Sequence, residues 1–224
     1  NKLIINEFKK KRLFKISYFN LDRNNHSQKR NLGIKKAKSN FIIFLDDDCF
    51  PEKTFVKDYF RILKKNKSKS IFCGSVLYPK NKSNFIKYRQ NRHFIVKNSS
   101  PFFREKIEIK NIVTMNMAFN LNNINYKKLF NERFNRYGFE DHDFAYWQEK
   151  SGVSILKSRP KIIHYDLRSY EKYLQKIVFV GKEGMKYFLK LNFDAAKDTN
   201  YYKLETNNYI KFLLKYKLSL GILE

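Results

Sequence analysis

Hydrophobic residues follow two different spacings along the chain, and each spacing predicts a different kind of element. The run FIIFL at 41–45 is apolar throughout, which is typical of a strand buried on both faces of a parallel sheet. FKISYFNL at 14–21 alternates apolar and polar positions, which indicates a strand with one buried face. Further strands are predicted at 70–79, 111–120, 153–158 and 161–166.

Helical spacing of apolar residues separates these strands. Pro51 is expected to open a helix that runs to about Lys65, because apolar residues recur there every three or four positions. The same spacing predicts a helix from Glu140 that Gly152 ends. Further helical segments are predicted at 1–12, in the second half of 22–40, within 80–110, around 122–130 and across 169–224. Strands that alternate with helices indicate an α/β fold with a mainly parallel sheet.

Three aspartates, Asp46, Asp47 and Asp48, directly follow the apolar run at 41–45. Ligands of α/β proteins bind outside the carboxyl ends of the strands, which is where these acids are expected. Their like charges repel one another, and a divalent cation such as Mg²⁺ or Mn²⁺ relieves that repulsion through oxygen ligands. The pattern therefore predicts a metal site, with helix capping by one aspartate as the alternative.

Three further polar stretches accompany the aspartates. QKRNLGIKKA at 28–37 precedes the apolar strand, and GFEDHDFAYW at 138–147 places acids at the start of a helix. KIIHYD brings His164 to the end of a predicted strand. The acids at the helix start have a simpler alternative role, which is to complement the helix dipole, and Asp143 fits that role best.

Together these stretches resemble the core of the family 2 glycosyltransferases of the GT-A fold. The shared pattern is RN-x-G-x-x-x-A, an apolar strand and LDDD-x-x-P, which spans residues 30–51. The later stretch NMAFN…FNRYGFEDHDF is similar to the ED motif of that group and to the carboxyl-terminal region of the β-galactosyltransferases. The resemblance extends over about residues 17–168. It implies a GT-A (Rossmann-like), mixed and mainly parallel sheet flanked by helices.

The resemblance implies a donor site for a nucleotide-sugar, with a UDP-sugar expected. Asp46 and Asp48 match the DxD motif of the family; Asp48 is expected to bind the metal directly, and Asp46 to lie nearer the ribose or a metal-bound water. His164 matches a histidine that related enzymes use as a further metal ligand, with a hydrogen bond to the backbone as its alternative role. Arg30 and Asn31 are expected near the nucleotide, although a solvated loop position fits Arg30 nearly as well. The metal, Mn²⁺ or Mg²⁺, would bridge the diphosphate and neutralise its charge as it leaves.

On the acceptor side, the resemblance implies that Asp141 is the general base and that Glu140 hydrogen-bonds the acceptor sugar. One base and one attacking hydroxyl give a direct displacement, which inverts the anomeric centre. A position at a helix N-terminus favours the ionised carboxylate of Asp141. The expected activity is that of a hexosyl- or N-acetylhexosaminyltransferase in glycan or polysaccharide biosynthesis, acting on a glycan or lipid-linked acceptor.

The chain departs from the family pattern at its beginning. Family members usually start with one strand that ends in Pro-Thr-Tyr-Asn and a second that ends in Asp-Asp-Gly-Ser, and neither motif is present. We therefore expect an amino-terminally truncated catalytic domain over residues 1–168, with a non-catalytic glycosyltransferase remnant as the alternative. Residues 169–224 are predicted to form a helical carboxyl-terminal extension that packs on this domain or rests on an anionic membrane surface.

The charge and the cysteine content of the chain indicate which partners and which cellular location to expect. The formal net charge of +26 raises nucleic acid as a partner, and the basic stretch at 82–106 is the best candidate for binding it. Nucleic acid is nevertheless disfavoured, because it leaves the acidic stretches unexplained, and an AT-rich genome accounts for the many lysines. Cys49 and Cys73 are too far apart for a zinc-binding spacing and suit a reducing cytosol. With no signal peptide in view, we expect a cytoplasmic protein that can contact the inner face of the membrane.

Overall fold

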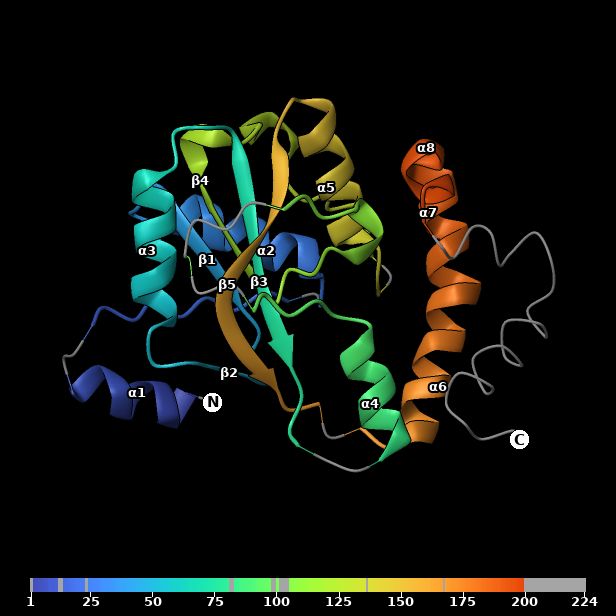
Figure 1. Cartoon of the computed structure of the whole chain (residues 1–224), viewed down its shortest axis with the longest axis horizontal. Helices are drawn as coiled ribbons and strands as arrows, with labels where there is room; N and C mark the ends of the chain where they lie inside the picture. Colours follow the sequence, from blue (N-terminus) through green and yellow to red (C-terminus); the bar gives the residue numbers. More distant parts are fainter. Residues whose placement is uncertain are drawn as a thin grey trace.

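A computed structural model describes residues 2–11, 14–22, 24–80, 83–97, 100, 105–135, 137–166 and 168–199. In this part of the chain, a five-stranded sheet has the order β1-β4-β3-β5-β2, and helices lie against it (Figure 1). The strands are β1 (Phe41–Leu45), β2 (Cys49–Pro51), β3 (Ser70–Leu77), β4 (Asn116–Asn120) and β5 (Ser154–His164). The predicted α/β class with a mixed sheet is therefore confirmed.

Helices flank the sheet and continue beyond its last strand. The described α-helices are α1 (Lys2–Lys10), α2 (His26–Lys36), α3 (Phe55–Lys65), α4 (Asn84–Asn91), α5 (Glu140–Lys150), α6 (Tyr170–Phe179), α7 (Met185–Leu191) and α8 (Phe193–Lys197). A π-helical turn, Val180–Gly184, joins α6 to α7, and short 3-10 turns form at Ile109–Asn111, Leu121–Asn123 and Tyr126–Lys128. No helix within the described ranges is long and apolar enough to cross a membrane.

The strand directions differ from the prediction of a mainly parallel sheet, which was wrong in this detail. β3 pairs with β5 in parallel, whereas β1 with β4, β3 with β4, and β2 with β5 are antiparallel pairs. β4 runs between β1 and β3 in the opposite direction, so β1, β3 and β5 still point the same way. A continuous apolar run shows that a strand is buried on both faces, but it carries no information on the direction of its neighbours.

Alternate residues of the strands build two cores, one on each face of the sheet. Ile71 of β3 and Met117 of β4 pack in the core that includes residues of α2 and α5. Phe72 and Ala118, the next residues along the same strands, pack in the core that includes α3. Helices on both faces therefore bury the strands and hold their ends in fixed positions.

Two predictions in the first half of the chain are wrong. Residues 14–21 form no strand, and Phe14 and Phe19 are exposed, because no strand of the described chain pairs with this segment. Pro51 does not open a helix; it lies in β2, at the edge of the described sheet, and α3 begins at Phe55. Proline suits an edge strand because it has no N–H to give to a neighbouring strand.

Two further predictions fail in the second half of the chain. The helix predicted around 122–130 is replaced by 3-10 turns, where the side chains of Asn120 and Asn125 accept hydrogen bonds from backbone amides. Asparagine side chains that bind nearby amides in this way compete with regular helix. The two strands predicted around Pro160 are one strand, β5, whose pairing with β3 shifts register near this proline.

The carboxyl-terminal helices lie beside α4 and α5 (Figure 1). Tyr173 and Ile177 of α6 pack against Phe85 of α4, and Phe188 of α7 stacks on Phe139, with ring centroids 5.1 Å apart. The described part of the predicted extension therefore contacts the rest of the protein. Residues 200–224 of this extension lie outside the described residues. Its contact with a membrane surface and the division of the chain at residue 168 stay predictions.

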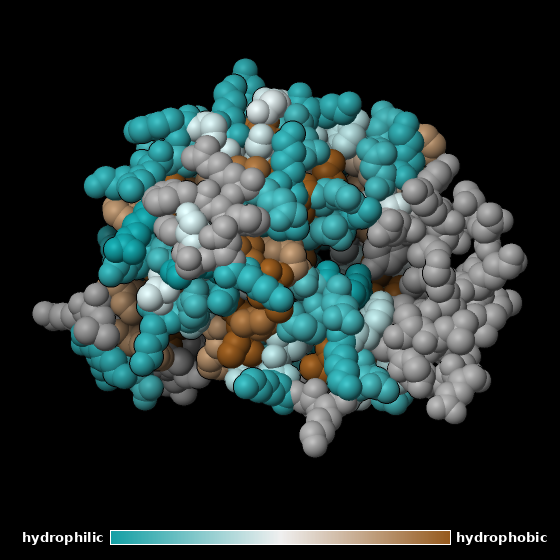
Figure 2. Space-filling view, in the orientation of Figure 1, coloured by the Kyte–Doolittle hydropathy of each residue, from teal (hydrophilic) through white to brown (hydrophobic). Residues whose placement is uncertain are grey.

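Hydrophilic side chains cover most of the described surface on the face seen in Figure 2, in keeping with the net charge of +26. A hydrophobic patch interrupts this surface over the end of β5. Phe50 of β2 is 61% exposed and pairs in the strand register with Ile163 of β5, which is 36% exposed. These two exposed side chains give the last pair of strands in the sheet order an apolar surface.

Candidate active site

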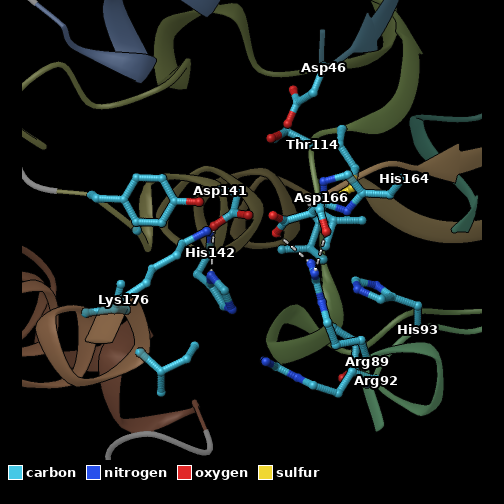
Figure 3. A pocket seen from close by; sticks show the side chains of 18 of the residues that line it. Asp46, Arg89, Arg92, His93, Thr114, Asp141, His142, His164, Asp166 and Lys176 are labelled. Carbon is cyan, nitrogen blue, oxygen red and sulfur yellow. Dashed lines mark hydrogen bonds and ion pairs between the residues drawn. The ribbon is translucent and has the colours of Figure 1, made fainter. Parts of the chain in front are cut away.

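A cavity of about 550 Å³ opens at the end of the sheet to which β1, β3 and β5 point. Asp46 follows β1, Tyr78 follows β3, and His164 ends β5, so strands of one direction deliver these side chains to one place. The start of α5 and residues of α4 and α6 complete the wall (Figure 3). Most of the predicted site residues line this cavity: Arg30, Asp46, Asp48, Glu140, Asp141 and His164.

Asp48 and His164 form the part of the cavity that can hold a divalent cation. The register of β2 on β5 pairs Cys49 with His164, which brings the preceding Asp48 next to the imidazole. Nε2 of His164 lies 3.1 Å from Oδ2 of Asp48. In the described ranges, ligand atoms of Asp48, Cys49 and His164 all lie within 4.8 Å of one another. The Asp48 side chain is 40% exposed and therefore remains open to a ligand.

Cys49 belongs to this group by distance but not by its chemistry. Burial raises the pKa of the Cys49 thiol far above its usual value, and the Asp48 and Asp46 carboxylates add to the rise. The thiol therefore stays protonated near neutral pH, and a protonated thiol is a poor ligand for a hard cation. Its Sγ lies 3.6 Å from Oδ1 of Asp48, so it supports the carboxylate rather than competing with it.

Asp46 faces the same cavity from the end of β1 (Figure 3). Partial removal from water raises the pKa of Asp46, Arg30 opposes the rise, and Asp48 adds to it. A cation near the two carboxylates would reverse this effect, because it favours their charged forms. The structure brings Asp46 into the cavity with Asp48, although its oxygens lie outside the compact group formed with His164.

The acidic start of α5 follows a backbone reversal. Gly138 and Phe139 both have positive φ, of 98° and 71°. A bulky residue rarely adopts this conformation, and Phe139 keeps it because its buried ring stacks on Phe188. The reversal directs the next two residues, Glu140 and Asp141, into the cavity wall.

Glu140 pairs with Arg30 of α2, whose Nη1 donates to Oε1 at 2.8 Å. Both side chains are largely buried, at 9% and 15% exposure. The second carboxylate oxygen of Glu140, Oε2, is buried and has no hydrogen-bond partner in the described part of the chain. Since an unsatisfied buried acceptor is costly, this oxygen is suited to accept a hydrogen bond from a bound ligand. Arg30 therefore acts on Glu140, and its contact with a nucleotide stays a prediction.

Asp141 makes its hydrogen bonds to its neighbour His142. Oδ1 accepts a hydrogen bond from the His142 amide at 2.9 Å and lies 2.8 Å from Nδ1 of the ring. Burial alone would raise the pKa of Asp141, but the charge and hydrogen bonds of His142 bring it below the usual value. For His142 the two effects have the opposite signs. Burial alone would lower its pKa, but the charge and hydrogen bond of Asp141 raise the pKa above its usual value. Asp141 is therefore ionised near neutral pH.

Asn31 is the predicted site residue that the structure does not bring to the cavity lining. Its Nδ2 donates to the carbonyl of Phe130 at 2.8 Å and to the Glu132 carboxylate at 2.9 Å. Its Oδ1 accepts a hydrogen bond from the Phe130 amide at 3.1 Å. These bonds occupy both polar atoms of the side chain, so Asn31 holds α2 against the segment before α5.

A group of charged residues in the cavity wall was missed by the sequence analysis. Asp166 accepts hydrogen bonds from Arg89 at 2.7 Å and from Arg168 at 2.6 Å. Lys176 of α6 lines the same cavity; burial lowers its pKa to about 8, and Arg168 contributes to the lowering. Arg89 and Asp166 are 77 positions apart in the chain. Nothing in the local spacing of residues signals such a pair.

Arg89 belongs to the basic stretch at 82–106, which was the candidate for nucleic-acid binding. Its side chain is 5% exposed and pairs with Asp166, and its guanidinium lies over the ring of Tyr78. A buried and paired guanidinium is not available to phosphates of a nucleic acid. Within the described part of this stretch, Arg89 therefore supports the cavity rather than a basic outer surface.

Replacement of Asp166 by Asn is expected to lower the free energy of unfolding by about 3 kcal/mol at pH 7, because it leaves two guanidinium groups without their anion. Burial would raise the pKa of Asp166, but Arg168 and Arg89 hold it well below its usual range. The carboxylate therefore stabilises the fold above about pH 4, and this contribution is lost as the pH falls below that value. Urea unfolding at several pH values measures the difference.

The matched control is Asp194→Asn, which removes the exposed ion pair of Asp194 with Lys197 on α8. We expect no measurable change in the urea midpoint, since solvent screens exposed pairs. Equal stability of Asp166→Asn and the wild type would show that Asp166 does not support the cavity wall.

The sequence of the chain matches one family of known proteins over much of its length. The sequence model described as Glycosyl transferase family 2 matches residues 2–127, which is more than half of the 224-residue chain. The matched part contains Asp46 and Asp48 and ends before the start of α5. No curated protein matches the chain. The mixed sheet flanked by helices agrees with the fold expected for this family. The chain therefore belongs to the family 2 glycosyltransferases.

Proposed function

We propose that this glycosyltransferase is metal-dependent and inverting, and that it moves a sugar from a UDP-sugar to a hydroxyl of a glycan or lipid-linked acceptor. The observation that carries the proposal is one cavity that contains both Asp48 with His164 and Glu140 with Asp141. The first pair suits a cation and the diphosphate of the donor. The second pair suits the acceptor hydroxyl, because it offers an ionised carboxylate and an unpartnered acceptor oxygen.

The residues of the cavity support a single displacement. Asp141 accepts the proton of the acceptor hydroxyl while the hydroxyl oxygen forms its bond to the anomeric carbon. The bond from that carbon to the diphosphate breaks, and its electron pair leaves with the nucleoside diphosphate. Oε2 of Glu140 accepts a hydrogen bond from the acceptor and orients it. Attack and departure on opposite faces of the carbon invert its configuration.

The site chemistry favours Mn²⁺ for this role. Mg²⁺ prefers a complete set of oxygen ligands, whereas imidazole is a common ligand of transition-metal ions. Asp48 supplies a carboxylate and His164 a ring nitrogen. When bound, the cation would supply positive charge to the leaving diphosphate. Arg168 and Lys176 line the same cavity and add positive charge to it.

Calorimetric titration with UDP, with and without Mn²⁺, tests this proposal. We expect binding only when the metal is present, followed by release of UDP from one member of a panel of UDP-sugars when an acceptor is added. Metal-dependent binding without turnover of any donor would favour the alternative of a non-catalytic remnant. A folded protein that does not bind UDP in either condition would contradict the proposed donor site.

Replacement of His142 by Gln is expected to move the acid limb of the profile of kcat/KM against pH to higher pH. Asp141 acts as a base only when ionised, so the acid limb follows its pKa. The charge of His142 lowers that pKa, and a neutral glutamine removes this effect, so the pKa rises. Initial rates measured across the acid range give the position of the limb.

His26→Gln is the control for the His142 variant, because His26 does not line the cavity. Its acid limb should coincide with that of the wild type. If the acid limb of His142→Gln also coincides with that of the wild type, the ionisation that sets this limb does not belong to Asp141.

A further inference from the structure

The hydroxyl of Tyr78 lies among three nitrogen atoms beside the candidate metal site. Nδ1 of His164 is 3.4 Å from Oη, Nε2 of His93 is 3.2 Å away, and Nη2 of Arg89 is 3.3 Å away. The other ring nitrogen of His164, Nε2, faces Oδ2 of Asp48. Figure 3 shows His164, His93 and Arg89 on the same side of the cavity. Tyr78 therefore links His93, which the proposed reaction does not use, to the imidazole that would bind the cation.

The hydrogens at this hydroxyl restrict how the groups can bond. A guanidinium only donates, so Arg89 occupies one of the two lone pairs on the Tyr78 oxygen. Tyr78 has a single hydrogen, which goes either to His93 or to His164. The imidazole that does not receive it must donate its own N–H to the remaining lone pair. The two arrangements therefore differ in which nitrogen of His164 carries a hydrogen.

One arrangement prepares His164 for a cation, and the other prevents binding. If Tyr78 donates to His164, the hydrogen of the neutral ring is on Nε2, where it points toward Asp48. If Tyr78 donates to His93, then His164 donates from Nδ1, and the lone pair on Nε2 faces Asp48. A divalent cation that joins Asp48 to His164 requires the second arrangement.

His93 is able to accept the hydrogen of Tyr78 because its ring stays neutral. Burial lowers the pKa of His93 to about 3, and the charges of Arg92 and Arg89 contribute to the lowering. At neutral pH the ring therefore has one nitrogen without a hydrogen, and Nε2 is the nitrogen that faces Tyr78.

We propose that His93 is a positioning residue that acts through the Tyr78 hydroxyl to hold His164 in the tautomer with hydrogen on Nδ1, which binds a divalent cation at Nε2. This inference rests on the metal of the proposed function and adds to it a residue that lies beyond α4. Loss of a hydrogen-bond partner on the second nitrogen of a metal-binding histidine lowers metal affinity by about 10- to 100-fold.

Measurement of Mn²⁺ binding in two variants of His93 tests the inference. In His93→Leu the hydrogen of Tyr78 has no acceptor at position 93 and turns to Nδ1 of His164, so we expect Mn²⁺ to bind about 10-fold more weakly or worse. In His93→Gln an amide oxygen can still accept, so affinity should stay close to that of the wild type. Electron paramagnetic resonance of free Mn²⁺, with UDP present, gives both affinities.

Circular dichroism establishes that each variant is folded. If His93→Leu does not fold, Tyr78→Phe replaces it, because it removes the hydroxyl and leaves Nδ1 of His164 without this partner. Wild-type affinity for Mn²⁺ in the folded variant would overturn the inference.

Nitrogen-15 NMR of protein labelled at its four histidines reads the tautomer directly. In the protein without metal, we expect hydrogen on Nδ1 of His164 in the wild type and a shift toward Nε2 in His93→Leu. A wild-type protein that binds neither Mn²⁺ nor Mg²⁺ would contradict the proposed function together with this inference. Normal metal binding with an unchanged tautomer in His93→Leu would contradict this inference alone.

Discussion

Asp141→Asn is expected to lower kcat for sugar transfer by about 10³-fold while the affinity for UDP and Mn²⁺ stays near that of the wild type. Asparagine keeps the size of the side chain but cannot take the proton of the acceptor hydroxyl. Asp141 lies outside the compact group of Asp48, Cys49 and His164, so donor binding should not change. Initial rates of UDP release and calorimetric titration with UDP separate the two effects.

Asp143→Asn, on the same helix, is the matched control for this variant. Burial raises the pKa of Asp143, and Nδ2 of Asn192 donates to its Oδ1 at 2.7 Å. An amide resembles a protonated carboxyl in this position, so we expect a kcat near that of the wild type. If Asp141→Asn keeps kcat within about tenfold of the wild type, another group takes the proton.

The strand-end residues of the site could be located from the sequence because their positions depend on local pattern. Apolar runs show where β1 and β5 end, and the polar residues that follow, such as Asp48 and His164, must then lie at one edge of the sheet. Glu140 and Asp141 could be placed at a helix start for the same reason. The structure brings these residues into one cavity.

Features that depend on distant partners could not be predicted in this way. The direction of β4 is decided by its pairing with β1 and β3, and the pattern NMAFN is compatible with either direction. Asn31 was expected near the nucleotide because it matches the family pattern, yet its side chain bonds to Phe130, 99 positions away. Its surroundings are set by the packing of α2.

The charged residues in the cavity wall also could not be predicted from the local sequence. Arg89 and Lys176 come from helices far apart in the chain, and each looks like an ordinary surface residue in its own segment. Arg89 pairs with Asp166, and Arg168 lowers the pKa of Lys176, only because α4 and α6 pack against each other in the fold. A resemblance confined to local motifs therefore finds the acids of the candidate site but not the basic residues that surround them.

Asp48→Ala is expected to weaken metal-dependent binding of UDP by about 100-fold or more, because a metal ligand should matter at least as much as the residues that support it. The side chain supplies the carboxylate that faces Nε2 of His164 at 3.1 Å. Without it, one imidazole remains from this pair, which is insufficient to hold a cation against a diphosphate. Calorimetric titration with UDP, in the presence and absence of Mn²⁺, measures the loss.

Asp47→Ala tests whether this effect belongs to Asp48 or to any of the three aspartates. Asp47 is exposed and does not line the cavity, so UDP and Mn²⁺ should bind to this variant as they do to the wild type. Equal loss in both variants would mean that the acids act through their summed charge rather than through coordination by one of them. If Asp48→Ala keeps metal-dependent binding of UDP, the cation does not bind between Asp48 and His164 at the end of β5. His164 would then not have the proposed role of metal ligand.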